Sequence, residues 1–172
     1  MNENICQYAV GQWVVHSHYG IGKIKEIEQI SFTGDMDKPE KCFRVETNNG
    51  VFWFPVEQDD NPRLRPISKK TKLELFLKSF QEPPEDTDAH HNVIKARISE
   101  AQNDVSLRTS IILVRDLLAR TVLKKHNILE DRALQMHKNR IIKEWSLCME
   151  LDEAETQARF NALIQNAELQ TA

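Results

Sequence analysis

Residues 42–55 read Cys42-Phe43-Arg44-Val45-Glu46-Thr47-Asn48-Asn49-Gly50-Val51-Phe52-Trp53-Phe54-Pro55. Asn48-Asn49-Gly50 separates two runs that are rich in β-branched and aromatic residues. Asn-Gly between two such runs is the clearest short signal of a β-hairpin. Pro55 ends the second run, because proline has no backbone N–H to donate to a sheet. The sequence therefore predicts a hairpin over this stretch.

Two β-prone runs precede the hairpin, at residues 12–15 and from Ile21 to about Ser31. In the longer run the apolar positions Ile24, Ile27 and Ile30 depart from strict alternation, which predicts a bend or a bulge. Four or five short strands ahead of Ile67 predict a small curled sheet or barrel.

After Ile67 the hydrophobic period changes to that of helices. We expect five helices, each with one apolar face and a polar residue as its N-cap, and such helices must pack on one another as a bundle. The expected caps are Ser68, Asp86 or Asp88, Asp104, Asn127 and Asp152. The expected faces are Leu73, Phe76, Leu77 and Phe80; Ile94, Ile98 and Ala101; Leu107, Ile111, Val114, Leu118 and Val122; Leu134, Ile141, Trp145 and Cys148; and Ala158, Ala162 and Leu163.

These patterns predict an α+β multi-domain protein. Residues 1–67 are expected to form a small β-domain, and residues 68–172 an all-α bundle of about five helices.

The formal net charge is −3, from 23 Lys and Arg against 26 Asp and Glu. Residues 1–68 hold 7 basic and 10 acidic side chains, and residues 69–172 hold 16 of each. This balance argues against nucleic-acid binding by bulk charge, but it leaves room for a local basic stripe. The third expected helix carries such a stripe, which either contacts phosphates or is a solvated helix face: Arg108, Arg115, Arg120, Lys124 and Lys125.

Phe52, Trp53 and Phe54 are three consecutive aromatic residues at the end of the hairpin. Because side chains alternate along a strand, at least one of them must lie on each face of the sheet. The outer set is covered either by another part of this chain or by a partner protein, since exposed aromatic residues are frequent at interfaces.

Several functions are not supported by the sequence. The three cysteines form no CxxC pair, and His16 and His18 have no evident third ligand, so we expect no disulfide framework and no metal or other cofactor. No P-loop, dinucleotide turn, nucleophile elbow or HExxH motif occurs, so we expect neither an enzyme nor a small-molecule substrate. No apolar run suits a membrane span or a secretory signal, and we expect a cytoplasmic protein.

The N-terminal run from Tyr8 to Ile24, YAVGQWVVHSHYGIGKI, resembles the start of the CarD/CdnL family of bacterial transcription regulators. Later pieces agree in order: Phe54-Pro55, then Leu64-Arg65-Pro66-Ile67, then the helical region. Within that region, residues 114–117 (VRDL) and 130–134 (EDRAL) are similar to family signatures. The resemblance covers nearly the whole chain.

The resemblance implies a Tudor-like β-barrel domain that binds the β subunit of bacterial RNA polymerase. It also implies a helical domain that contacts promoter DNA in the polymerase complex and modulates the stability of the open complex. On this basis the polymerase-binding candidates are Val51, Phe52, Trp53 and Phe54. The candidates for phosphate contact are Lys95, Arg97, Arg108 and Arg115, with His90 and His91 near the groove.

Two positions differ from the family pattern. The family has a tryptophan near the start of its second helix that wedges into the DNA minor groove, and the alignment places His90 there. Trp53 occupies a position that is basic in the family. The prediction is therefore a transcription regulator with weakened or altered DNA contact. The alternative is a protein-interaction adaptor on the same scaffold that binds no DNA.

Overall fold

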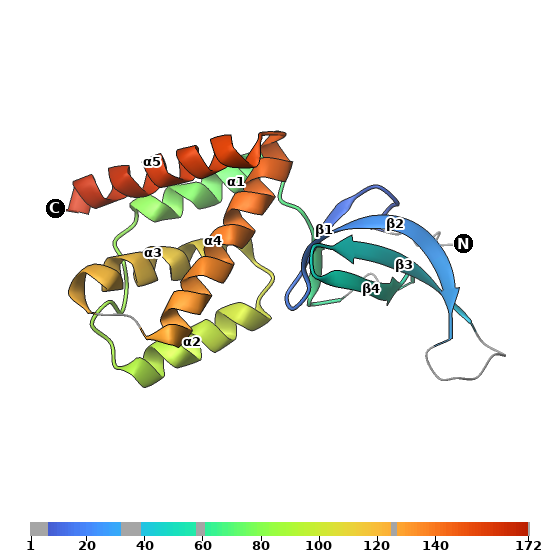
Figure 1. The fold of residues 1–172 in the computed structure, drawn as a ribbon, viewed down its shortest axis with the longest axis horizontal. Helices are drawn as coiled ribbons and strands as arrows, with labels where there is room; N and C mark the ends of the chain where they lie inside the picture. Colours follow the sequence, from blue (N-terminus) through green and yellow to red (C-terminus); the bar gives the residue numbers. More distant parts are fainter. Residues whose placement is uncertain (1–6, 32–38, 58–60, 125–126, 172) are drawn as a thin grey trace. The chain divides into compact units, whose positions relative to one another are not determined.

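The structure, a computed structural model, describes residues 7–31, 39–57, 61–124 and 127–171, with the side chains of 167–171 excepted (Figure 1). The chain divides into two compact units, residues 1–67 and residues 68–172. The first unit holds strands and the second holds helices, so the predicted α+β class is confirmed. Each unit is described by itself below.

The first unit is a five-stranded antiparallel sheet with the order β4-β3-β2-β1-β5. Its strands are β1 (Trp13–His16), β2 (Gly20–Ile30), β3 (Glu40–Thr47), β4 (Gly50–Pro55) and β5 (Leu64–Pro66). The hairpin between β3 and β4 is confirmed: Thr47 faces Gly50 across a two-residue turn. Over the described residues the ladder ends at β4 on one side and β5 on the other, so the curled sheet is not closed by hydrogen bonds into a barrel.

The curl of the sheet has a local cause in β2. The predicted irregularity is confirmed as a register shift against β3 between Ile24 and Glu26. A few residues earlier, a Cβ atom added at Gly22 would lie 2.6 Å from Val45 Cγ1 and 2.8 Å from the Glu46 carbonyl oxygen. Only glycine allows the two backbones to approach this closely, which lets β2 bend across β3.

One face of the sheet carries the core of the first unit. The register places Val14, Ile24, Val45 and Phe52 on this face, with Phe43 and Phe54 two residue pairs further along β3 and β4. Tyr8 closes the cluster, with its ring edge-on to Phe54 at 5.3 Å between centroids. The opposite face carries charged side chains, among them Arg44 and Glu46, together with the buried Cys42 and Val15.

The second unit contains α1 (Lys70–Leu77), a 3₁₀ turn η1 (Lys78–Gln81), α2 (His91–Asn103), α3 (Leu107–Leu123), α4 (Ile128–Met149) and α5 (Glu153–Thr171). The five predicted helices are therefore confirmed. Their buried faces form one core, in which the Phe80 and Phe160 rings meet edge to face at 5.6 Å.

The predicted caps are correct for α4 and α5 and wrong for the other three helices, where α3, for example, begins after Ser106 and not after Asp104. Asn127 accepts a hydrogen bond from the Glu130 N–H at 3.0 Å, and Asp152 accepts one from the Ala154 N–H at 3.0 Å. The cap of α2 is His90 and not Asp86 or Asp88, because the His90 ring accepts from the Asn92 N–H. Ser68 caps no helix; its hydroxyl donates to Glu144 at 2.8 Å.

Three expected core residues are not in the core. Val122 is 79% exposed at the end of α3, and Ala158 and Ala162 are exposed on α5. Helix α5 instead buries Phe160 and Thr156, one turn apart. The aromatic ring excludes more apolar surface from water than two methyl groups do, and so it sets the rotation of α5.

Candidate functional site

Strand β4 is an edge of the sheet: among the described residues no strand pairs with its outer side. The Val56 N–H donates to the Lys41 carbonyl at 2.9 Å, which shows which residue pairs of the hairpin are hydrogen-bonded and which are not. Because hydrogen-bonded and non-bonded pairs alternate in an antiparallel ladder, Phe54 and Phe52 bond to β3. The backbone groups of Val51 and Trp53 then point outward. This edge can accept an added strand.

The four polymerase-binding candidates divide between the two faces of β4. Val51 and Trp53 are 37% and 39% exposed, whereas Phe52 and Phe54 are 6% and 3% exposed. The Phe52 ring stacks on Tyr19, with 4.9 Å between centroids. The prediction is corrected for Phe52 and Phe54: alternation points both into the core, where no partner reaches them. Val51 and Trp53 remain.

Trp53 is held in place by a hydrogen bond that the sequence did not reveal. Its indole Nε1–H donates to Glu28 Oε2 at 2.7 Å, across β3. The register of β2, shifted by the bulge, places Glu28 opposite Cys42 and so on the polar face. Without knowledge of that shift, the residue could not be assigned to the same face as Trp53.

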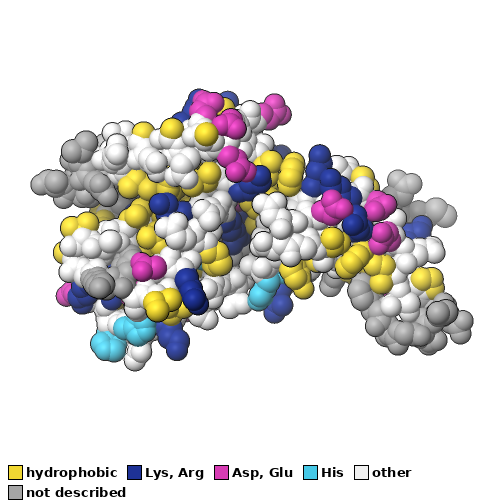
Figure 2. All heavy atoms as spheres, viewed as in Figure 1, with side chains coloured by type: hydrophobic (Ala, Val, Ile, Leu, Met, Phe, Trp, Pro, Cys, Tyr) yellow, Lys and Arg dark blue, Asp and Glu magenta, His cyan; other side chains and the backbone are white. Residues whose placement is uncertain are grey.

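Arg44 organises the charges beside Trp53. Its guanidinium lies 2.7 Å from Glu46, 3.2 Å from Glu26 and 3.8 Å from Glu28. The hydrogen bond from Arg44 lowers the pKa of Glu46 below its usual value. Figure 2 shows acidic and basic side chains interleaved over the strands of this unit. The polar face is thus a network of charges with Trp53 at its edge.

His16, considered above as a metal ligand, has a structural role. Its Nδ1 accepts from the backbone N–H groups of His18 and Tyr19, at 3.1 and 3.3 Å, and its ring lies 5.1 Å from the Phe52 ring. Burial, followed by the nearby His18 and Arg63, lowers the pKa of His16 to about 4. A neutral ring suits this position in the turn between β1 and β2.

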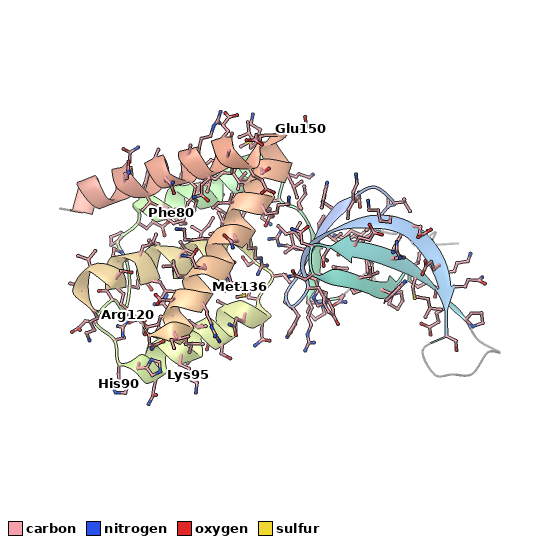
Figure 3. The ribbon with its side chains drawn as sticks, in the orientation of Figure 1. Phe80, His90, Lys95, Arg120, Met136 and Glu150 are labelled. Carbon is pink, nitrogen blue, oxygen red and sulfur yellow. The ribbon has the colours of Figure 1, made fainter. Side chains whose placement is uncertain are left out.

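The start of α2 displays three of the candidates for DNA contact. His90, His91 and Lys95 are exposed, and Figure 3 shows His90 and Lys95 extending from α2 away from α3. His91 Nδ1 lies 2.8 Å from the Asn127 amide nitrogen and 3.6 Å from Glu130. The start of α2 is thereby tied to the start of α4.

The expected basic stripe does not form over the described residues of α3, and Lys125, its last expected member, lies outside them. Arg115 is buried, and its Nε–H donates to Asp116 at 2.7 Å. Arg120 is buried too; it donates to the carbonyl oxygens of Thr87 and Ala89, both at 2.9 Å. The two cations are paired with the buried carboxylates of Asp116 and Glu130, and Arg120 also holds backbone carbonyl groups of the segment between η1 and α2. Arg115 is therefore not available to phosphates, and its prediction was wrong.

The remaining DNA candidates are separated or already paired. Arg97 forms ion pairs with Asp116 and, at 3.5 Å, with Asp86. Arg108 is exposed, but it lies at the start of α3, which follows the C-terminal end of α2, whereas His90 precedes the N-terminal end of α2. Lys124 is paired with Asp88 at 2.5 Å. The candidates do not form one basic surface.

Comparison with known families assigns the first unit. Residues 8–68 match the family model described as CarD-like/TRCF RID domain. This is a family of RNA polymerase-interacting domains, and the matched residues of the RID include β4 and its outer edge. The resemblance read from the sequence is therefore confirmed for this unit.

A search of curated proteins gave no significant match to the chain. No helix in the described parts of the chain has the length and apolar character that crossing a membrane requires.

Proposed function

We propose that this protein binds the β subunit of bacterial RNA polymerase by strand addition to β4, and that its helical unit then modulates the stability of the promoter open complex. The proposal is carried by one observation: a RID domain presents an edge strand on which Val51 and Trp53 offer both backbone groups and exposed side chains. The role is one of binding, with no catalytic step.

The helical unit is proposed to approach DNA with the start of α2. His90, His91 and Lys95 are exposed there, but Asp86 and Asp88 lie in the segment just before it. So little positive charge displaces few counterions, and the free protein is expected to bind duplex DNA negligibly at physiological salt. The contact becomes effective when the polymerase holds the DNA beside it.

The protein-interaction adaptor is a second candidate, and the structure of α3 favours it. Arg115 and Arg120 form hydrogen bonds inside the helical unit, and Arg97 is paired with Asp116. Of the six residues expected at DNA, two basic side chains remain exposed, Lys95 and Arg108. On this reading the helical unit binds another protein.

Polymerase capture by the Val51→Pro variant tests the docking mode. The Val51 N–H points away from β3, so proline removes a donor to the added strand and leaves the hairpin bonds intact. We expect loss of binding to RNA polymerase core enzyme. Leu75→Ala, a change at an exposed apolar residue of α1, is the matched control and is expected to bind as the parent does. Normal capture by folded Val51→Pro would overturn strand addition at β4.

The two candidate functions separate in a promoter assay. A regulator changes the lifetime of open complexes formed with polymerase, and this effect is reduced by charge reversal at Lys95. If the protein is an adaptor, the parent chain and the Lys95 variant bind polymerase equally well, and neither changes the lifetime of the open complexes.

A further inference from the structure

The two tryptophans of the sheet differ in what their rings contact. The Lys23 ammonium lies 5.6 Å from the centroid of the Trp13 ring, a distance typical of a cation–π contact. Over the described residues no cation is placed on the ring of Trp53 in this way, although Trp53 is 39% exposed. Trp53 therefore displays an aromatic surface that remains available.

The orientation of Trp53 is fixed before any partner arrives. Its Nε1–H donates to Glu28 at 2.7 Å, so the ring lies over β3 toward β2. A ring that is already held loses little conformational freedom on binding, which favours its use as an anchor.

The charge around Trp53 favours a cation. The register places four carboxylates on the same face of the sheet, against the three cations Arg44, Lys23 and Lys25. Arg44 is shared among three of the carboxylates. The four are Glu26, Glu28, Glu40 and Glu46.

The geometry of strand addition decides which partner residue meets the ring. A residue of the added strand directly opposite Trp53 has its Cβ about 5 Å away and its side chain on the same face. The stem of a lysine or arginine there spans β4 and places its charge over the indole. Shorter side chains end before the ring.

We propose that the strand added to β4 carries a lysine or arginine opposite Trp53, and that the Trp53 ring binds this cation. Glu28 acts as a positioning residue that holds the indole in place. This inference rests on the proposed docking of the RNA polymerase β subunit on β4, and it names the chemistry of the partner strand.

A double-mutant cycle tests the pairing, with the full chain and RNA polymerase core enzyme. Each Lys or Arg in the docking segment of the β subunit is changed in turn to Met, which keeps the stem and removes the charge. One such change should weaken binding by about 2- to 30-fold, the range expected for a cation–π contact. When the chain carries Trp53→Leu, the same change in the β subunit should cause no further loss of binding affinity. Additive losses at every basic position would overturn the inference.

Two variants of the chain distinguish cation binding from apolar packing. Trp53→Phe should retain more affinity than Trp53→Leu, because a phenyl face still attracts a cation and an aliphatic side chain does not. Glu28→Ala should weaken binding, whereas Glu26→Ala, a change of equal charge that spares the indole hydrogen bond, should weaken it less. Equal binding by the Phe and Leu variants would show that Trp53 acts only through its apolar surface.

The inference and the proposed function fail in different ways. If Val51→Pro still captures polymerase, docking at β4 is wrong. If Val51→Pro abolishes capture while no basic residue of the partner couples to Trp53, docking at β4 stands and cation recognition is wrong. Circular dichroism of each variant checks the fold, and the side chains of Val51 and Trp53 are solvent-exposed.

Discussion

His137 Nδ1 lies 3.0 Å from Ser110 Oγ, and neither side chain reaches solvent. Burial, with a smaller contribution from Arg140, lowers the pKa of His137 to about 4. The unfolded chain binds a proton near pH 6.5, so acid favours unfolding. We expect the free energy of unfolding to be unaffected by this group above pH 6.5 and to fall by about 3 kcal/mol by pH 4.

The variant His137→Leu checks this prediction by urea unfolding at a series of pH values. Its stability should depend less steeply on pH between 6.5 and 4 than that of the parent chain. His16, whose pKa is also lowered to about 4, makes the β unit less stable in acid as well. The His137→Leu variant still shows this separate loss of stability. Identical pH profiles for the parent and the variant would contradict the assignment.

Arg120 should be essential to the helical unit although it lies in no binding surface. The change Arg120→Met leaves Glu130 buried with its ion pair broken and leaves two carbonyl oxygens without their donor. Loss of one partner from a buried ion pair costs about 3–5 kcal/mol. The exposed Arg108→Met should change stability by less than about 0.5 kcal/mol. Equal unfolding midpoints for the two variants would contradict the role given to Arg120.

Gly22 should tolerate no side chain. In Gly22→Ala the new methyl group would meet Val45 Cγ1 and the Glu46 carbonyl oxygen, and the backbone of β3 cannot yield cheaply. We expect a loss of about 1–3 kcal/mol, as for overpacked cores, against a negligible change for Gln29→Ala on the exposed end of β2. Thermal unfolding measures both, and a stable Gly22→Ala would show that β2 and β3 can separate without loss.

Lys95 and His90 test whether the start of α2 faces DNA. Lys95→Glu should shorten the lifetime of open complexes, and Arg108→Glu, beyond the C-terminal end of α2, should not. His90→Trp should lengthen that lifetime if the alignment with the family wedge is right, at the cost of about 1 kcal/mol for the lost cap. Filter-binding decay of promoter complexes measures all three, and unchanged lifetimes throughout would leave the adaptor function as the explanation.

Much of the fold was predictable because its signals are local. The Asn48-Asn49-Gly50 segment specifies the β3–β4 hairpin within a few residues, and the irregular spacing of Ile24, Ile27 and Ile30 predicted the bulge. The cap at Asn127 and the buried faces of α1 and α2 likewise depend on neighbours in the sequence. The match to the RID family rests on the same N-terminal residues that indicated it.

The site was less predictable because it depends on partners that are distant in sequence. Alternation required Phe52, Trp53 and Phe54 to divide between two faces, but only the register with β3 determines which of them are buried. The pattern of α3 could not show that Arg115 and Arg120 point inward, since Glu82, Thr87, Ala89 and Glu130 lie in other segments. A cation beside an apolar stripe looks solvated until its buried acceptors are known.

The short free edge of β4 also bears on how the protein behaves when it is abundant. Unprotected sheet edges are templates for uncontrolled self-association and fibril growth. Here Val51 and Trp53 present outward amide groups, and Pro55, which has none, follows directly. So few backbone bonds cannot sustain polymerisation of identical chains, and the like charges of neighbouring copies oppose it further. Under the proposed docking, the strand is long enough to recognise one partner and too short to nucleate an aggregate.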